Sequence, residues 1–121
     1  MDSDLRARLA RIACAFPEAE RDATHGGHDA YAVRGKKFAY FLDNHHGDGR
    51  TAVTVRCPPG EHTRLIESDP VRFFMPAYLG PRGWVGLRLD LARVDWDEVE
   101  RLVLDSYVLQ APKRLAALVR S

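Results

Sequence analysis

The sequence predicts an α+β domain with an antiparallel sheet. Two observations indicate this fold class: strand-like segments follow one another through the middle of the chain, and amphipathic helical patterns stand at both ends. Strands joined by short connections are most simply antiparallel. The chain has 121 residues, the size of one domain, so we expect a single unit over 1–121.

The composition is that of a soluble globular protein, with 45% hydrophobic and 29% charged residues. Lys and Arg number 18 against 17 Asp and Glu, so a polyanion-binding surface requires sorting of charges, not an excess of them. No apolar run approaches the roughly 20 residues of a membrane span, and the N-terminus has no secretory pattern. Cys14 and Cys57 have no CxxC spacing, which favours reduced thiols in a cytoplasmic protein without a membrane partner.

The first half of the chain begins with a predicted helix over 3–16, where apolar residues recur at helical spacing before Pro17. The polar segment 17–30 is expected to be a loop or a short edge strand. Alternating patterns then predict three strands, and a hairpin link at Gly35, Lys36 and Lys37 joins the first two. These strands are expected at 30–34, 38–43 and 51–57.

The second half begins with a short predicted helix over 61–67, followed by strands at 73–75 and 84–90. Asp95 with Glu98 three residues later forms a capping box, which predicts the start of a longer helix. Pro112 interrupts that helix, and a last short helix is expected over 113–120.

Of the eleven aromatic side chains, the eight between positions 31 and 84 divide into two predicted groups. Those at alternating strand positions are expected in the core, because large aromatic rings dominate the cores of small domains. They include Phe38, Tyr40, Phe73 and Phe74. Tyr78 and Trp84 flank a Gly- and Pro-rich stretch and are expected to be the more exposed rings.

No common catalytic signature is present: the sequence lacks GxxxxGK[ST], GxGxxG, HExxH and GxSxG. No serine has a local histidine or acid partner in a recognisable nucleophile motif. We therefore assign no catalytic residue and favour a non-enzymatic domain.

Two alternative functions stay open. Loops around His25, Asp43, His45 and Tyr78 are candidates for binding a small molecule, an anion or a metal, and an enzyme is included in this alternative. The histidine spacing matches no standard metal site, so no metal and no cofactor is expected. The other alternative is a protein-interaction module, which an exposed apolar patch near 73–84 would support.

Cations gather at the predicted turns and near the C-terminus. Basic side chains on protruding turns suit phosphate contacts, which need only charge and reach. The alternative is a solvated turn whose lysines keep the sheet edge from pairing with another chain. The candidate nucleic-acid-binding residues are Arg34, Lys36, Lys37, Arg50, Arg82, Lys113 and Arg114.

Five strings occur in a specific order: GKKFAYFLDNHHGDGR, CPPGE, RFFMPAYLGPRGWVGLRLD, DWDEV and SY…APKRL. From about Ala19 to the end, the chain thereby resembles the MmcQ/YjbR family, described as having a CyaY-like, double-wing DNA-binding fold. The resemblance implies a curved antiparallel sheet packed by N-terminal and C-terminal helices, two β-hairpin wings and a role in binding DNA. It matches Lys36 and Lys37 to the family's Gly-Lys-Lys element, and Lys113 and Arg114 to its Ala-Pro-Lys-Arg element.

We therefore expect a monomeric cytoplasmic domain that binds DNA weakly, without much sequence preference, through phosphate contacts of its basic turns.

Overall fold

A computed structural model describes residues 2–120, with every side chain in that range except those of residues 2, 3, 25 and 46. The strands form one sheet in the order β1-β2-β3-β4-β6-β5, and all neighbouring strands are antiparallel. Their bounds are β1 Ala19–His25, β2 His28–Val33, β3 Lys36–Asp43, β4 Thr51–Arg56, β5 Phe73–Phe74 and β6 Trp84–Arg88. The predicted α+β class with an antiparallel sheet is confirmed.

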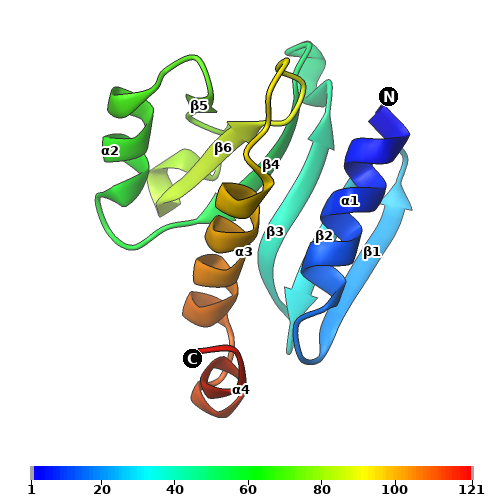
Figure 1. Cartoon of the computed structure of the whole chain (residues 1–121), viewed down its shortest axis with the longest axis vertical. Helices are drawn as coiled ribbons and strands as arrows, with labels where there is room; N and C mark the ends of the chain where they lie inside the picture. The colour runs from blue at the N-terminus through cyan, green and yellow to red at the C-terminus, as the bar shows by residue number, and fades with distance from the viewer. Residues whose placement is uncertain (1, 121) are drawn as a thin grey trace.

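The helices are α1 (Asp2–Cys14), α2 (Glu61–Ser68), α3 (Trp96–Gln110) and α4 (Lys113–Val119). Figure 1 shows α1 and α3 in front of the sheet, α4 below α3, and α2 beside β5 and β6. Short 3₁₀ turns lie at His45–Gly47 and Gly80–Arg82. Within residues 2–120, no helix is long and apolar enough to cross a membrane.

An aromatic core lies between the sheet and the two helices α1 and α3. The Tyr107 ring of α3 stacks on Phe16 at 5.0 Å and meets Phe38 edge-on at 5.3 Å between ring centroids. The Tyr107 hydroxyl donates a hydrogen bond to the carbonyl of Pro17 at 2.7 Å, so a buried polar group is satisfied. This contact fixes the end of α1 to α3, although the two residues are 90 positions apart.

Helix α3 begins after Asp95 as the sequence predicts, but the Glu98 side chain of the expected capping box forms an ion pair with Arg72. The Asp95 side chain accepts hydrogen bonds from the backbone N–H groups of Asp97 and Glu98, at 3.1 and 3.2 Å. An N-cap of this kind satisfies donors that have no partner within the helix. The acidic first turn also lies at the positive end of the helix dipole.

Polar side chains near the end of α3 hold this helix against the beginning of β3 and the end of β4. Ser106 is fully buried, and its hydroxyl donates to the carbonyl of Phe38 at 2.6 Å and accepts from the N–H of Arg56 at 3.0 Å. One turn later, Gln110 donates to the carbonyl of Lys37 at 2.9 Å. We call these contacts of Ser106 and Gln110 the α3 clamp.

The hairpin between β2 and β3 differs from the prediction. The turn consists of Arg34 and Gly35, with φ of 50° and 80°, and positive φ at both positions is typical of a two-residue type I′ turn. Lys36 and Lys37 belong to β3 and not to the turn. The expected loop or edge strand at 17–30 contains the edge strand β1, which pairs with β2.

A register shift in the β2–β3 pairing changes which aromatic rings reach the core. Tyr31 pairs with Ala39 but Ala32 pairs with Lys37, so Phe38 is the extra residue of a bulge. Phe38 and Ala39 are both buried in the core as a result. The predicted alternation, with Phe38 and Tyr40 on one face, was therefore wrong.

The sheet face turned away from α1 and α3 is called the back face. Its positions alternate with the core positions and pair across the strands: Tyr40 with Thr54, Thr54 with Gly86, and Gly86 with Phe74. Arg56 and Trp84 form the neighbouring pair. The back face is defined here by Lys37, Tyr40, Thr54, Arg56, Phe74, Trp84 and Gly86.

Three aromatic predictions fail on the back face. Tyr40 and Phe74 were expected in the core, but both are half-buried on this face. Trp84 was expected to be exposed, but only 5% of its surface is accessible, and its ring lies 5.6 Å from that of Tyr40. The segment between Phe74 and Trp84 contributes walls to two cavities on the back face, a placement that strand alternation alone does not reveal.

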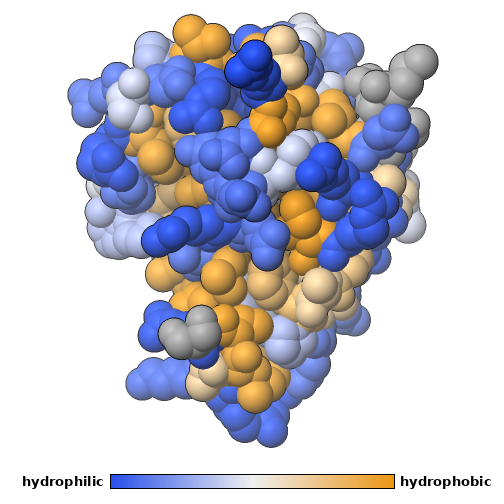
Figure 2. Space-filling model, viewed as in Figure 1, coloured by the Kyte–Doolittle hydropathy of each residue, from blue (hydrophilic) through white to orange (hydrophobic). Residues whose placement is uncertain are grey.

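The helix-covered side is shown in Figure 2, where apolar side chains gather over the lower parts of α3 and α4. Leu109 and Leu118 are 42% and 68% exposed there.

A buried carboxylate ties α1 to the edge of the sheet. The Asp29 side chain is inaccessible to solvent and accepts hydrogen bonds from Arg6 at 2.6 and 3.0 Å, from Arg21 at 2.8 Å and from the Tyr31 hydroxyl at 3.2 Å. Burial opposes ionisation, but the hydrogen bonds from Arg6 and Arg21 outweigh it, and the pKa of Asp29 lies below its ordinary value. The ionised form of Asp29 is therefore the form that the fold stabilises.

Replacing Asp29 with Asn should lower the free energy of unfolding by about 2 kcal/mol at pH 7, because two arginines lose their charged partner. The pKa of Asp29 is lower in the folded chain, so its contribution is present above the ordinary pKa of 3.8 and disappears as the pH falls through the folded value. Denaturant titrations at pH 7 and pH 3 should show a smaller difference at pH 3. The exposed Asp105→Asn variant is the control, with a change of at most about 0.5 kcal/mol. An equal loss in the two variants would contradict this role.

Gly86 permits a close approach between β6 and the Phe74 ring. A Cβ atom at position 86 would overlap the ring carbons of Phe74. Gly86→Ala should therefore lower the free energy of unfolding by about 1–3 kcal/mol, measured by denaturant titration. Gly27→Ala is the matched control, since its Cβ would lie 3.8 Å from the nearest atom, in ordinary contact with Asp43. Equal stability of the two variants would show that the Phe74 ring is not held against Gly86.

Candidate nucleic-acid interface

Four cations line one cavity, of about 540 Å³, where β3 begins and β4 ends. Tyr40, Leu79, Trp84 and Gln110 complete its wall. We call it the cationic cavity and define it by its basic residues Lys36, Lys37, Arg56 and Arg82. Three of these four were predicted from the sequence.

The α3 clamp positions part of the cationic cavity. The Gln110 side chain accepts a hydrogen bond from the Arg56 guanidinium at 2.7 Å while it donates to the carbonyl of Lys37. One amide thus holds a cation of β4 beside the strand that carries the two lysines. Arg82 comes from the other side, in the 3₁₀ turn Gly80–Arg82, where its N–H donates to the carbonyl of Leu79 at 2.9 Å.

The charged side chains that line the cationic cavity are all basic. Among residues 2–120, no Asp or Glu lines it, and none of its four cations forms an ion pair with a described acidic side chain. Burial raises the pKa of the Tyr40 hydroxyl above its ordinary value, and the nearby charge of Arg82 opposes the rise. Tyr40 therefore stays neutral at pH 7 and adds no negative charge.

The arginines that form ion pairs are not the ones that line the cationic cavity. Six arginines are paired in this way: Arg6 and Arg21 with Asp29, Arg34 with Glu18, Arg64 with Glu61, Arg72 with Asp69 and Glu98, and Arg88 with Asp90. Six of the described acids are thus paired with arginines that do not line the cationic cavity. The net charge of +1 therefore does not reveal that cations without a described acidic partner lie together at one cavity while other arginines are paired with acids.

Arg34, Lys113 and Arg114 do not line the cationic cavity. The Arg34 guanidinium donates to both carboxylate oxygens of Glu18, at 2.5 and 3.0 Å. That hydrogen bonding, with a smaller effect of the Arg114 charge, lowers the pKa of Glu18. Lys113 and Arg114 are exposed at the start of α4.

Arg50 lines a second cavity, of about 390 Å³, which we call the aromatic cavity. Its guanidinium lies 4.3 Å from the centroid of the Phe74 ring. Tyr40 and Leu79 line both cavities, so the two are adjacent on the back face. Asp48 also lines the aromatic cavity, which therefore has mixed charge.

Arg56 is the functional candidate that sequence reasoning missed. Arg56 lies near the end of the predicted strand 51–57, on the face opposite Val55. The candidate cations were chosen at turns or in groups, and Arg56 is in neither. Its cross-strand partner is Trp84, and Gln110 holds its side chain. The strand alternation places Arg56 on the same face as Thr54, and that face is the back face of the sheet. This shared face is the signal that could have identified Arg56.

The alternative set of His25, Asp43, His45 and Tyr78 is only partly brought together. His45 and Tyr78 line the aromatic cavity, whereas Asp43 accepts a hydrogen bond from the hydroxyl of Thr51 at 3.1 Å. The side chain of His25 lies outside the described residues. Among the described side chains, no group of three or more His, Cys, Asp or Glu is arranged to hold a metal ion.

The region 73–84, where an interaction patch was considered, has mixed exposure. Met75 and Tyr78 are 49% and 80% exposed, but Phe73 and Trp84 are buried.

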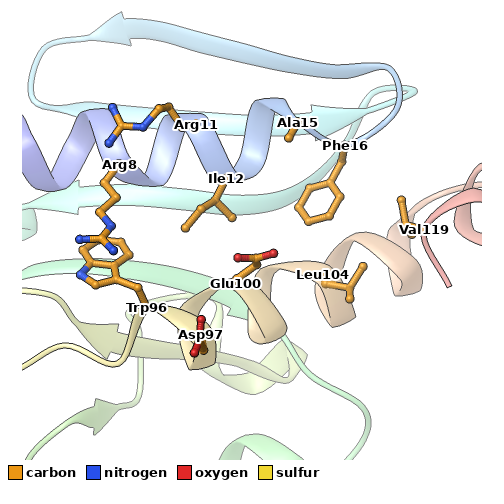
Figure 3. Close-up of a pocket in the computed structure, with 10 residues that line it drawn as sticks. All are labelled: Arg8, Arg11, Ile12, Ala15, Phe16, Trp96, Asp97, Glu100, Leu104 and Val119. Atoms are coloured by element: carbon orange, nitrogen blue, oxygen red, sulfur yellow. The ribbon is translucent and has the colours of Figure 1, made fainter. Parts of the chain in front are cut away.

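A larger cavity, of about 600 Å³, lies between α1 and α3 (Figure 3). Arg8 and Arg11 project from α1, and the Arg8 guanidinium lies 4.5 Å from the centroid of the Trp96 ring. Asp97 and Glu100 line it from α3. Because both signs of charge line this cavity, it is a poorer site for a polyanion than the cationic cavity.

The comparisons with known proteins agree with the fold. A crystal structure of Deinococcus radiodurans protein DR2400, with a domain described as DUF419, has a TM-score of 0.68 and 17% sequence identity. The similarity covers 84% of this chain and 74% of that chain. No curated protein matches the sequence. A family model described as YjbR matches residues 14–109, which is most of the chain, and the chain therefore belongs to the YjbR family.

Proposed function

We propose that this protein binds DNA through contacts between its cationic cavity and the phosphate backbone. The observation that carries the proposal is the grouping of Lys36, Lys37, Arg56 and Arg82 around one concavity that no described acid lines. Phosphate groups are recognised by such clusters because the interaction requires positive charge within reach of the backbone. Arg82 and Arg56 can also present two N–H groups to one phosphate.

The binding is expected to be weak and largely independent of sequence. Contacts to phosphates position a protein on nucleic acid but carry no direct sequence information. Four neutralised phosphates give a log–log salt slope of about −3 to −4. Non-specific complexes of this kind have dissociation constants of roughly 10⁻⁴ to 10⁻⁶ M at physiological salt.

Reversing two charges in the cavity provides the test. The double variant Lys36→Glu/Lys37→Glu should weaken binding to a fluorescent DNA duplex by at least about tenfold in low salt, because two phosphate contacts become repulsive. Fluorescence anisotropy measures the affinity, and the slope against salt concentration should become shallower by about two contacts.

The matched control is Arg11→Glu/Arg101→Glu, which changes the net charge by the same amount on exposed positions of α1 and α3. It should reduce the affinity much less than the variant of the cavity. Equal losses in the two double variants would show that only overall charge matters. No binding of DNA by the unmodified protein at tens of micromolar in low salt would overturn the proposal.

A further inference from the structure

We propose that the aromatic cavity beside the cationic cavity takes an unpaired nucleobase, so that the preferred ligand is single-stranded nucleic acid. This inference rests on the proposed function and names its ligand more closely. The aromatic cavity lies next to the four cations because Tyr40 and Leu79 belong to both walls. A base in one cavity and the phosphates of the same strand in the other require no movement of the sheet.

The lining of the aromatic cavity suits a flat, partly apolar group. Leu42, Phe74, Met75 and Leu79 supply apolar surface, and Tyr78 and Arg50 supply planar groups. Its volume of about 390 Å³ falls within the roughly 300–1,000 Å³ of small-molecule sites. Apolar side chains beside an arginine are typical of sites where bases stack on rings or guanidinium planes, and the Asp48 carboxylate in this lining can accept a hydrogen bond from a base.

Arg50 is held in a position where its guanidinium plane can face a base. It lies over the Phe74 ring at 4.3 Å, and the Phe74 ring is itself held against the backbone of Gly86. Phe74 therefore supports Arg50 and is not itself the surface on which a base stacks. Arginine stacked between a ring and a base contributes both a planar contact and a positive charge near the strand.

Tyr78 presents its ring to solvent at the rim of this cavity, with 80% of its surface exposed. Its backbone has φ of 65°, and the N–H of Leu79 donates to the carbonyl of Ala77 at 2.7 Å, which closes a tight turn centred on Tyr78. A non-glycine residue in this conformation costs of order 1–3 kcal/mol. A large ring is thus exposed at the rim of the aromatic cavity, at a position where glycine would be less strained.

The geometry favours a single strand over a duplex. In a duplex the bases are paired and stacked inside, so their faces cannot reach Tyr78 or Arg50. A single strand offers both the phosphates that the cations need and a base whose face is free.

The test compares four ligands of the full chain by fluorescence anisotropy in low salt: a short oligothymidine, a duplex of equal length, an abasic strand of equal charge, and thymidine monophosphate as competitor. Tyr78→Ala should weaken binding of oligothymidine by about tenfold and leave the duplex and the abasic strand unchanged. Tyr78→Phe should retain the affinity of the unmodified protein. Competition by thymidine monophosphate at concentrations where inorganic phosphate does not compete would show that the base contributes to recognition beside the phosphates.

Tyr78→Gly controls for folding, because it removes the ring and relieves the positive φ, so its thermal midpoint should not fall. It should bind as Tyr78→Ala does. If Tyr78→Ala affects all strands equally, or none, while Lys36→Glu/Lys37→Glu still abolishes binding, the base site is overturned and the phosphate site stands. If no nucleic acid binds the unmodified protein, the proposed function itself fails.

Discussion

The α3 clamp is the interaction on which the candidate site depends. Ser106 joins the carbonyl of Phe38 to the N–H of Arg56, at the point where the pairing of β3 with β4 has ended. Because both groups are buried or partly buried, leaving them without partners would cost about 1–3 kcal/mol each. Gln110 extends the same connection to Lys37 and to the Arg56 side chain. The helix that covers the core therefore also holds Arg56 beside Lys37 in the wall of the cationic cavity.

Some charged side chains of this protein form ion pairs within the fold, and others line the cationic cavity without a described acidic partner. Asp29 neutralises two arginines inside the fold, and Glu18 and Asp90 each hold an arginine at a strand end or turn. These pairs occupy acids, and none of them involves a residue that lines the cationic cavity. The result is a chain with a net charge of +1 that still presents four cations together. Average composition is thus a poor guide to the local field, which depends on where the ion pairs form.

Much of the fold was predictable from the sequence, because helices with clear caps and strands with regular alternation are local patterns. Asp95 capped α3 as expected, and Val53 and Val55 lie in the core as their alternation indicates. The bulge at Phe38 was not predictable, since it depends on a register that only the pairing of β2 with β3 reveals. The DNA-binding expectation and the monomeric state stay predictions, as no comparison addresses them.

The candidate site was predictable in part. Lys36, Lys37 and Arg82 were chosen for their place near turns, and the fold brings them to one cavity. Arg34 and Arg114 were chosen on the same ground, but they lie around Glu18, which is distant in sequence from both. Pairing with a distant acid is a tertiary property, and so is the contact that places Arg56 beside Gln110.

The position of the clamp in the chain has a consequence for synthesis. The sheet residues that carry Lys36, Lys37 and Arg56 precede Gln110 in the chain and are therefore synthesised before it. Because a domain folds as a unit, the contacts of Gln110 with the Lys37 carbonyl and the Arg56 side chain form only when α3 docks. The cationic cavity is therefore completed later than the strands that carry most of its cations, and its completion reports on the packing of α3.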